Sequence, residues 1–136
     1  MDLARSMKIA AAGLDAQATR LKTVSENLAN ANSTATTPGG LPYRRKAVTF
    51  ANVLDRALDA RLVKVAKVEP VPGDFERHYD PSHPAADKDG YVLEPNVNPL
   101  LELMDMREAQ RSYQANLNVI DAAKTMISRT IDLLHS

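Results

Sequence analysis

The chain has 136 residues, about the length of one domain, and its 17 basic side chains balance 17 acidic ones, so the net charge is zero. That balance disfavours a nucleic-acid surface or a basic membrane-binding face, and no apolar run approaches the ~18 residues of a membrane-spanning helix. The chain has no cysteine, which excludes structural disulfides and cysteine-ligated zinc.

The first 30 residues predict one long amphipathic helix. Apolar residues recur along it at alternating steps of three and four, broken at Gln17, and form a seam for another helix: Leu3, Met7, Ala10, Leu14, Leu21, Val24 and Leu28. A second column, seven residues apart, contains small residues that either admit a close neighbour or reflect the helix propensity of alanine: Ala4, Ala11, Ala18 and Ser25. Asn30 and Asn32 predict a left-handed cap at the end of this helix.

The same region has some features of a secretion signal. Lys8 precedes the apolar run Ile9–Leu14, and Ala16-Gln17-Ala18 has the small residues of a cleavage site. However, the run is short, it ends at Asp15, and the apolar seam continues through the supposed cleavage site without a change of phase. We therefore expect a helix and no cleaved signal peptide.

The middle of the chain is rich in proline and predicts short β-strands between irregular loops. In chain order we expect a loop over 31–42, an extended segment over 43–50, helical spacing over 51–60, and strands over 62–69, 74–79 and 90–93.

The last helix is predicted to open at Asn98-Pro99 and to run to about Leu134. Pro99 suits a first helical turn, and Glu102 suits the positive end of the helix dipole. The main apolar stripe has breaks at Gln110 and Lys124 and consists of Leu103, Met106, Tyr113, Leu117, Ile120, Ile127, Ile131 and Leu134. An additional apolar column, which indicates more than one neighbour, consists of Val119, Met126 and Leu133.

These elements predict a mainly α fold with a small β-rich insert. Residues 1–32 and 98–136 would supply long helices that pack as a coiled-coil-like inner domain, and residues 33–97 would form an irregular β-containing middle domain. A lone two-helix pair of this composition is marginal, so we expect the termini to become ordered on assembly.

The candidate chemical sites are weak. The cluster of His78, Asp80, His83, Asp87 and Asp89 lies among prolines rather than on one helix face, which favours a polar loop over a metal site. Within it, Asp89-Gly90 predicts a hairpin turn rather than a calcium loop.

The basic cluster Arg44-Arg45-Lys46 either binds phosphate or an acidic partner or, as we favour, forms a solvated strand edge. The sequence shows no phosphate loop, nucleophile elbow or carboxylate pair in an apolar pocket. We expect no enzyme activity, no cofactor and no metal.

Asparagine stands beside the apolar seam in both helices, at Asn27 before Leu28 and at Asn116 before Leu117. Because asparagine is a poor helix former, it either hydrogen-bonds across helices and fixes their register or belongs to a solvated polar rim.

Several blocks of the sequence resemble the axial proteins of the bacterial flagellum, the family of rod and hook subunits. The block Ser25–Asn30 resembles the end of the first helix in that family. The proximal-rod members are most similar over Pro42–Lys46, Tyr79–Pro84, Asp89–Val92, Pro95–Asn98 and Arg111–Asn116. The resemblance covers nearly the whole chain.

This resemblance implies a structural subunit of the proximal rod, the shaft that transmits torque and encloses the export channel. It implies export through the flagellar type III apparatus without a cleaved signal, and assembly in the periplasm. The partners would be copies of itself, other rod proteins, and the basal-body base and rod-adaptor proteins. The expected subunit-interface residues are Leu14, Leu21, Val24, Asn27, Leu28, Asn30, Tyr113, Asn116, Leu117, Ile120, Ile127 and Ile131.

The alternative is a soluble coiled-coil adaptor or chaperone-like binding module. In that case the heptads would close into a discrete dimer or tetramer, and the middle would bind a ligand.

Overall fold

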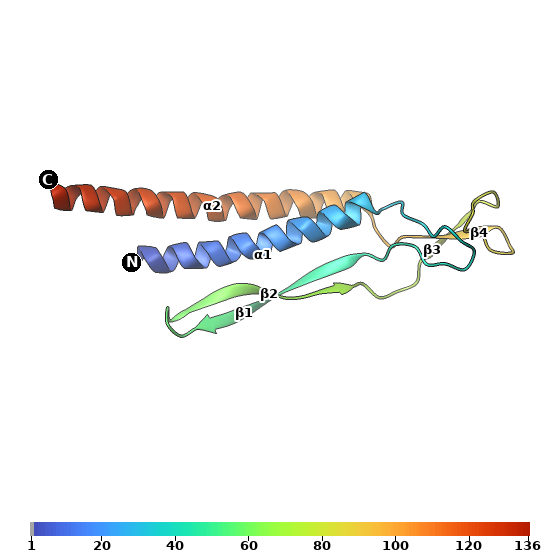
Figure 1. Cartoon of the computed structure of the whole chain (residues 1–136), viewed down its shortest axis with the longest axis horizontal. Helices are drawn as coiled ribbons and strands as arrows, with labels where there is room; N and C mark the ends of the chain where they lie inside the picture. The colour runs from blue at the N-terminus through green and yellow to red at the C-terminus, as the bar shows by residue number, and fades with distance from the viewer. Residues whose placement is uncertain (1) are drawn as a thin grey trace. The chain divides into compact units, whose positions relative to one another are not determined.

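The computed structural model describes residues 2–136 and has a long helix at each end of the chain and, between them in the sequence, four strands (Figure 1). In chain order the elements are α1 (Leu3–Ala29), β1 (Lys46–Asp55), β2 (Ala60–Pro70), β3 (Glu76–Tyr79), β4 (Tyr91–Glu94) and α2 (Pro99–His135). The strands form two separate two-stranded sheets, β1 with β2 and β3 with β4. The predicted terminal helices and β-containing middle are confirmed.

The chain divides into two compact units, and each unit is built from several segments. Unit 1 contains the residues up to Leu21, Val48–Lys67 and Arg107–Ser136, and unit 2 contains Lys22–Ala47 and Val68–Met106. Both helices and both strands of the β1–β2 hairpin therefore contribute to both units. The predicted inner and middle domains are defined by the place of each segment in an assembly, not by contacts within one chain. That division of the chain stays a prediction.

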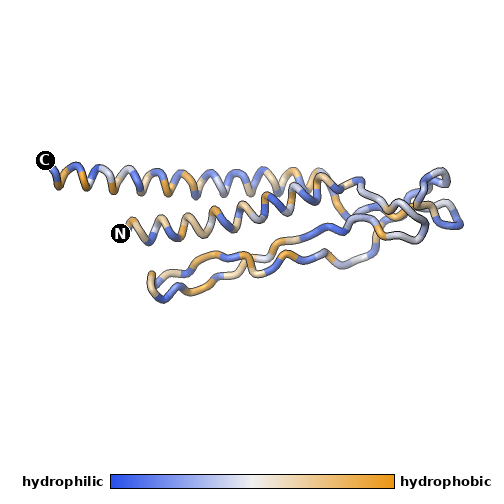
Figure 2. Tube along the Cα trace, in the orientation of Figure 1, coloured by the Kyte–Doolittle hydropathy of each residue, from blue (hydrophilic) through white to orange (hydrophobic). Residues whose placement is uncertain are grey.

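Both helices are amphipathic. Polar and apolar stretches alternate along each of them (Figure 2). Among residues 2–136, no helix combines the length and the apolar character needed to cross a membrane.

Side-chain hydrogen bonds close the ends of both helices. Asn98 caps α2, because its Oδ1 accepts hydrogen bonds from the N–H groups of Leu100 (3.1 Å) and Leu101 (3.4 Å). At the end of α1, Asn30 donates from Nδ2 to the Glu26 carbonyl at 2.8 Å. The expected left-handed cap at Asn30 or Asn32 is wrong, since Asp59 is the non-glycine residue with positive φ among those described.

The helical spacing seen over 51–60 is overruled by strand pairing. Residues 46–55 form β1, and the chain turns through Asp55–Asp59 into β2. A helix of ten residues is marginal in water, whereas pairing with β2 gives the backbone groups of this segment partners along the ribbon. The valine-rich strand expected over 62–69 is confirmed as part of β2.

The core of unit 1 consists mainly of small side chains. Its buried apolar residues are Ala10, Ala16, Ala60, Ala109 and Ala123. A Cβ atom at Gly13 would lie 2.7 Å from Nδ2 of Asn116, so the two helices approach closely at this point. The predicted column of Ala4, Ala11, Ala18 and Ser25 is exposed, and both explanations for it remain open.

This close approach predicts that Gly13→Ala lowers the stability of the natural chain but raises the stability of a variant that lacks the Asn116 amide. Gly13→Ala would gain about 1 kcal/mol of helix propensity, but its methyl group would collide with the Asn116 amide, so we expect net destabilisation of about 1 kcal/mol. In an Asn116→Ala background the collision is absent, and the same change should stabilise the chain. Urea-denaturation midpoints of the four proteins measure the coupling, and strictly additive effects would contradict the contact.

In unit 2, β3 and β4 pair antiparallel, with Tyr79 opposite Tyr91. The expected turn at Asp89-Gly90 exists, because Gly90 N–H donates to the Asp87 carbonyl and Gly90 has φ 85°. It is not a tight hairpin turn, however, since the whole segment between Tyr79 and Tyr91 connects the strands. Asp87 organises this loop by accepting hydrogen bonds from the N–H groups of Asp89 and Tyr91, both at 2.9 Å.

These contacts predict an acid-sensitive loop. The Tyr91 N–H, followed by the Asp89 N–H and Arg77, holds the pKa of the Asp87 carboxyl below its usual range. Its stabilising effect is therefore present above the unfolded-state value of about 4 and is lost as the pH falls through the folded pKa. We expect NMR to show that the protection of the Tyr91 amide from hydrogen exchange, measured relative to a free peptide, decreases as the pH falls through this range. Asp87→Asn should remove that pH dependence, and an unchanged profile would contradict the assignment.

Candidate functional site

A buried polar junction centred on Asn27 ties together three segments of unit 2. The Asn27 side chain is 0% exposed. Its Oδ1 accepts hydrogen bonds from the Lys46 N–H (2.9 Å) and the Tyr43 hydroxyl (2.7 Å). Its Nδ2 donates to the Lys46 carbonyl (2.8 Å) and to Oε2 of Glu102 on α2 (3.4 Å). One amide thus links the end of α1, the start of β1 and the first turns of α2.

Glu102 supplies the charge of this junction. The residue is 1% exposed, and its Oε1 is ion-paired with Nε of Arg45. A buried carboxylate without partners would cost several kcal/mol, and Arg45 and Asn27 supply Glu102 with those partners. Glu102 does stand in the first turn of α2, as expected for the helix dipole, but its main contacts are with other segments.

Surrounding groups extend the junction. Asn96 Oδ1 accepts from the Arg45 N–H at 2.7 Å, and the Arg45 carbonyl accepts from the Val71 N–H at 2.7 Å. Burial raises the pKa of the Tyr43 hydroxyl, and the nearby Glu26 and Glu102 carboxylates raise it further. Tyr43 therefore stays neutral at physiological pH, and its hydroxyl donates a hydrogen bond to Oδ1 of Asn27.

The basic cluster does not form the solvated strand edge that we favoured from the sequence. Arg45 pairs with Glu102, and the amine of Lys46 lies 3.6 Å from Glu26. Arg44 donates to the carbonyls of Val71 (2.8 Å) and Gly73 (2.9 Å), and its guanidinium stacks 4.2 Å from the centre of the Phe75 ring. These cations are used inside unit 2, which also argues against the phosphate-binding alternative.

The sequence interpretation missed Tyr43, Arg45, Asn96 and Glu102 as members of one site. A signal was present for three of them, because Tyr43, Arg45 and Asn96 lie in the blocks that resemble flagellar axial proteins. Apolar periodicity reports only local structure, so it does not reveal a contact between residues 57 positions apart, such as Arg45 and Glu102.

The polar loop of unit 2 has structural contacts of its own. Nδ1 of His83 accepts from the Ala85 N–H at 3.0 Å, and its Nε2 lies 3.1 Å from the Thr34 hydroxyl. Because Nδ1 is an acceptor, the neutral ring carries its proton on Nε2. Over residues 2–136, no three His, Asp or Glu side chains group in a way that could hold a metal ion.

The two asparagines beside the seam differ. Asn27 hydrogen-bonds across helices, as one alternative predicted. Asn116 instead donates from Nδ2 to the Ser112 carbonyl of its own helix at 3.0 Å, while its side chain lies against Gly13. The prediction of a bond across helices is therefore wrong for Asn116.

The predicted interface residues lie in three environments. Val24 and Asn27 are buried within the chain. Half-buried positions make up most of the set: Leu14, Leu21, Leu28, Asn30, Tyr113, Asn116, Leu117, Ile120 and Ile127. Ile131 is exposed.

The C-terminal part of α2 leaves its apolar residues open to solvent. Leu133 is 76% exposed and Leu134 is 80% exposed, and Met126 and Val119 are exposed as well. Apolar side chains that are exposed together along a helix mark an interaction surface. The additional apolar column predicted from the sequence consists of Val119, Met126 and Leu133, and all three residues are exposed.

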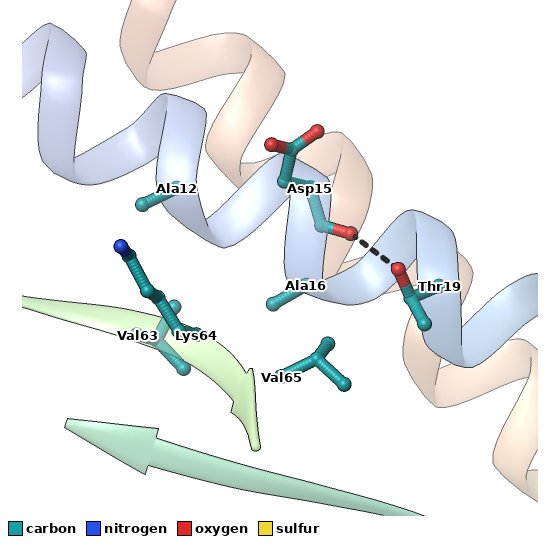
Figure 3. A pocket seen from close by; sticks show the side chains of 7 residues that line it. All are labelled: Ala12, Asp15, Ala16, Thr19, Val63, Lys64 and Val65. Carbon is teal, nitrogen blue, oxygen red and sulfur yellow. Dashed lines mark hydrogen bonds between the residues drawn. The ribbon is translucent and has the colours of Figure 1, made fainter. Parts of the chain in front are cut away.

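Unit 1 also contains a groove of about 420 Å³ between α1 and β2. The residues that line it are Ala12, Asp15, Ala16, Thr19, Val63, Lys64 and Val65 (Figure 3). Ala12 and Ala16 point from α1 toward the strand, and the Lys64 side chain extends from β2 toward Ala12 (Figure 3). The Asp15 carboxylate points away from β2, and its carbonyl accepts from the Thr19 hydroxyl at 3.2 Å. The groove is thus lined by four apolar residues and three polar ones, with the Lys64 cation projecting over it.

Two family models match the chain at its ends. Residues 7–35 match the model described as flagella basal body rod protein. Residues 88–133 match the model described as flagellar basal body rod FlgEFG protein, C-terminal. The first match covers most of α1, and the second covers β4 and nearly all of α2.

Proteins named flagellar basal-body rod protein FlgC are similar over almost the full length. The protein from Agrobacterium fabrum is 54% identical over 97% of this chain and 95% of its own. The protein from Salmonella typhimurium is 40% identical over 98% of each chain, and that from Bacillus subtilis is 36% identical over 94% of this chain and 95% of its own.

Proposed function

The chain belongs to the FlgC family of flagellar basal-body rod proteins, and on that premise we propose that it polymerises through its two terminal helices. It is a structural subunit of the rod in the flagellar basal body, where it associates with other rod components, and it is not an enzyme. This membership sets aside the alternative of a discrete-oligomer adaptor.

The observation that carries the proposal is the exposed apolar surface on α2. A helix that served only the chain's own core would bury one stripe and expose polar groups elsewhere. Here Val119, Met126, Ile131, Leu133 and Leu134 are all exposed. Contact with neighbouring subunits would bury these side chains, at about 25 cal/mol for each Å² of apolar surface removed from water.

The buried small residues of unit 1 support the same conclusion. A core of alanines gains little free energy from burial, because an alanine side chain removes little apolar area from water. The large residues of the seam, such as Leu14, Leu117 and Ile120, are only half-buried in the single chain. We propose that they complete their packing against neighbours in a coiled-coil-like inner domain, which would resist torque through many contacts.

The two regions of the molecule would then have different tasks. The terminal helices would form the inner wall of the torque-transmitting shaft and export channel, and the middle of the chain would face outward. The buried residues Val24 and Asn27, although expected at the interface, would act through the chain's own fold. The half-buried and exposed residues of the predicted set would meet other subunits.

The route to the rod is part of the proposal. We propose that the chain crosses the inner membrane through the flagellar type III apparatus, without a cleaved signal, and assembles in the periplasm. Its neighbours would be copies of itself, other rod proteins, and the base and adaptor proteins of the basal body. Two observations support this route. Residues Ser25–Asn30 resemble the flagellar axial proteins, and the segment 8–18, which has some features of a secretion signal, is part of helix α1.

Sedimentation and hydrogen exchange on the purified chain test the proposal. We expect a monomer whose terminal helices exchange rapidly, because their apolar surfaces lack the partners that the rod would supply. A stable dimer or tetramer with fully protected terminal helices would favour the adaptor instead and would contradict open-ended polymerisation through these helices.

A further inference from the structure

We propose that the groove between α1 and β2 receives the C-terminal part of α2 from a second copy of the chain, with Met126 and Leu133 as the inserted side chains. This inference rests on the proposed function, because it specifies which faces of two rod subunits meet.

The spacing of the two surfaces matches. The groove is lined along α1 from Ala12 to Thr19, two positions that lie seven residues or about 10.5 Å apart along the helix. Met126 and Leu133 are also seven residues apart and therefore lie on one face of α2, two turns from each other. The small side chain of Ala16 leaves room between them, and a groove of about 420 Å³ is in the size range that accommodates a small ligand.

The inserted residues are available. Met126 is 54% exposed and Leu133 is 76% exposed in the single chain, so the chain does not bury its own α2 end in its own groove. Moreover α2 has 37 residues and α1 has 27, so α2 is ten residues longer than the helix that could cover it. A second copy can supply the partner that the first lacks.

Charge sets the direction of the inserted helix. The Lys64 side chain projects over the groove toward Ala12 (Figure 3). The C-terminal end of a helix carries partial negative charge, and Asp132 stands next to Leu133. The structure therefore favours Leu133 at the Ala12 end, beside Lys64, with the inserted helix antiparallel to α1.

The contact is heterologous, since each copy carries one groove and one α2 end. Such contacts do not close between two copies; they continue from subunit to subunit and generate rings or helical filaments. The geometry of the pair is thus that of a polymer rather than a dimer.

Disulfide cross-linking tests the contact directly, because the chain has no cysteine of its own. Pairs of single-cysteine variants replace the rod subunit of a flagellated strain, and the basal bodies are isolated and oxidised. We expect a cross-linked dimer from Ala12→Cys with Leu133→Cys. We expect none from Ala12→Cys with Met126→Cys, because position 126 lies about 10.5 Å from position 133 along the helix and a disulfide spans no more than about 7 Å between Cα atoms. The exposed loop variant Lys88→Cys serves as the matched control for random collision.

A charge swap provides an independent measurement. Lys64→Glu and Asp132→Lys should each cause loss of most swimming, and the double variant should restore it. Motile cells whose basal bodies contain the variants but give no 12–133 dimer would overturn the groove contact and leave rod membership intact. A dimer with Met126→Cys in place of Leu133→Cys would overturn the antiparallel orientation. Basal bodies that assemble without the protein would contradict the proposed function itself.

Discussion

Replacing Asn27 by leucine should lower the free energy of unfolding of unit 2 by about 3–5 kcal/mol. Leucine has the same branched arrangement of side-chain heavy atoms, but it leaves the Lys46 N–H and carbonyl and the Tyr43 hydroxyl without their partner. Each buried polar group that loses its hydrogen bond costs about 1–3 kcal/mol. Because domains are typically stable by only 5–15 kcal/mol, this loss is a large fraction of the total.

The measurement is the urea-denaturation midpoint, with Asn118→Leu as the matched control. Asn118 is exposed on α2 and hydrogen-bonds with Gln114 of the same helix, so its replacement should change stability by no more than about 0.5 kcal/mol. Equal effects of the two leucine substitutions would contradict the role of the junction.

Asn27→Asp separates hydrogen bonding from packing. Aspartate keeps the oxygen that accepts from Lys46 and Tyr43, but it lacks the Nδ2 donor and places a second carboxylate beside Glu102. Two carboxylates at this distance repel unless one is protonated. The destabilisation should therefore be large at neutral pH and should shrink as the solution is acidified, whereas that of Asn27→Leu should not follow this trend.

Replacing Ile131 by aspartate should abolish swimming without unfolding the single chain. Ile131 is 49% exposed, so a charged side chain at this position is solvated in the monomer. In a packed interface between subunits the same carboxylate would lose its water. We expect a loss of about 3 kcal/mol or more per contact, which corresponds to roughly 100-fold weaker association. Since the loss recurs at each copy, rod assembly should fail.

Three measurements define this experiment: swimming in soft agar, the number of rods in isolated basal bodies, and circular dichroism of the purified variant. Thr125→Asp is the matched control, because it adds the same charge on a side of α2 away from both Ile131 and the Met126–Leu133 face, where the side chain is also exposed. Cells with Ile131→Asp that swim normally and carry normal rods would contradict the proposed interface. A variant that loses its helical signal in solution would place Ile131 in the chain's own fold instead.

The long helices were the most predictable part of the fold. The expected segments 2–30 and 98–134 differ by one residue at each end from α1 and α2. Their apolar periodicity is a local property of the sequence, and their ends have local causes such as Asn98 and Asn30. The strands over 62–69, 74–79 and 90–93 were also found nearly where expected, because prolines and glycines bound them.

The assembly surface was foreseeable in outline. The columns that contain Ile131 and Leu133 were visible as heptad repeats, and a seam with more stripes than one partner needs indicates several neighbours. Which positions the chain uses for itself was not visible. Val24 belongs to the same stripe as Leu21 and Leu28, and Asn27 stands beside that stripe, yet of these four residues only Val24 and Asn27 are buried.

The sequence by itself determined the two terminal helices, the absence of disulfides, and the resemblance to flagellar axial proteins, because each depends on residue identity or on short-range spacing. Only the tertiary structure decided three other features: that 51–55 pairs as a strand, that Arg45 and Glu102 meet beside Asn27, and that a groove opens between α1 and β2. The reason is physical. Strand pairing, a buried ion pair and a groove each depend on groups tens of residues apart, and their free energies exist only once the folded chain has brought those groups together.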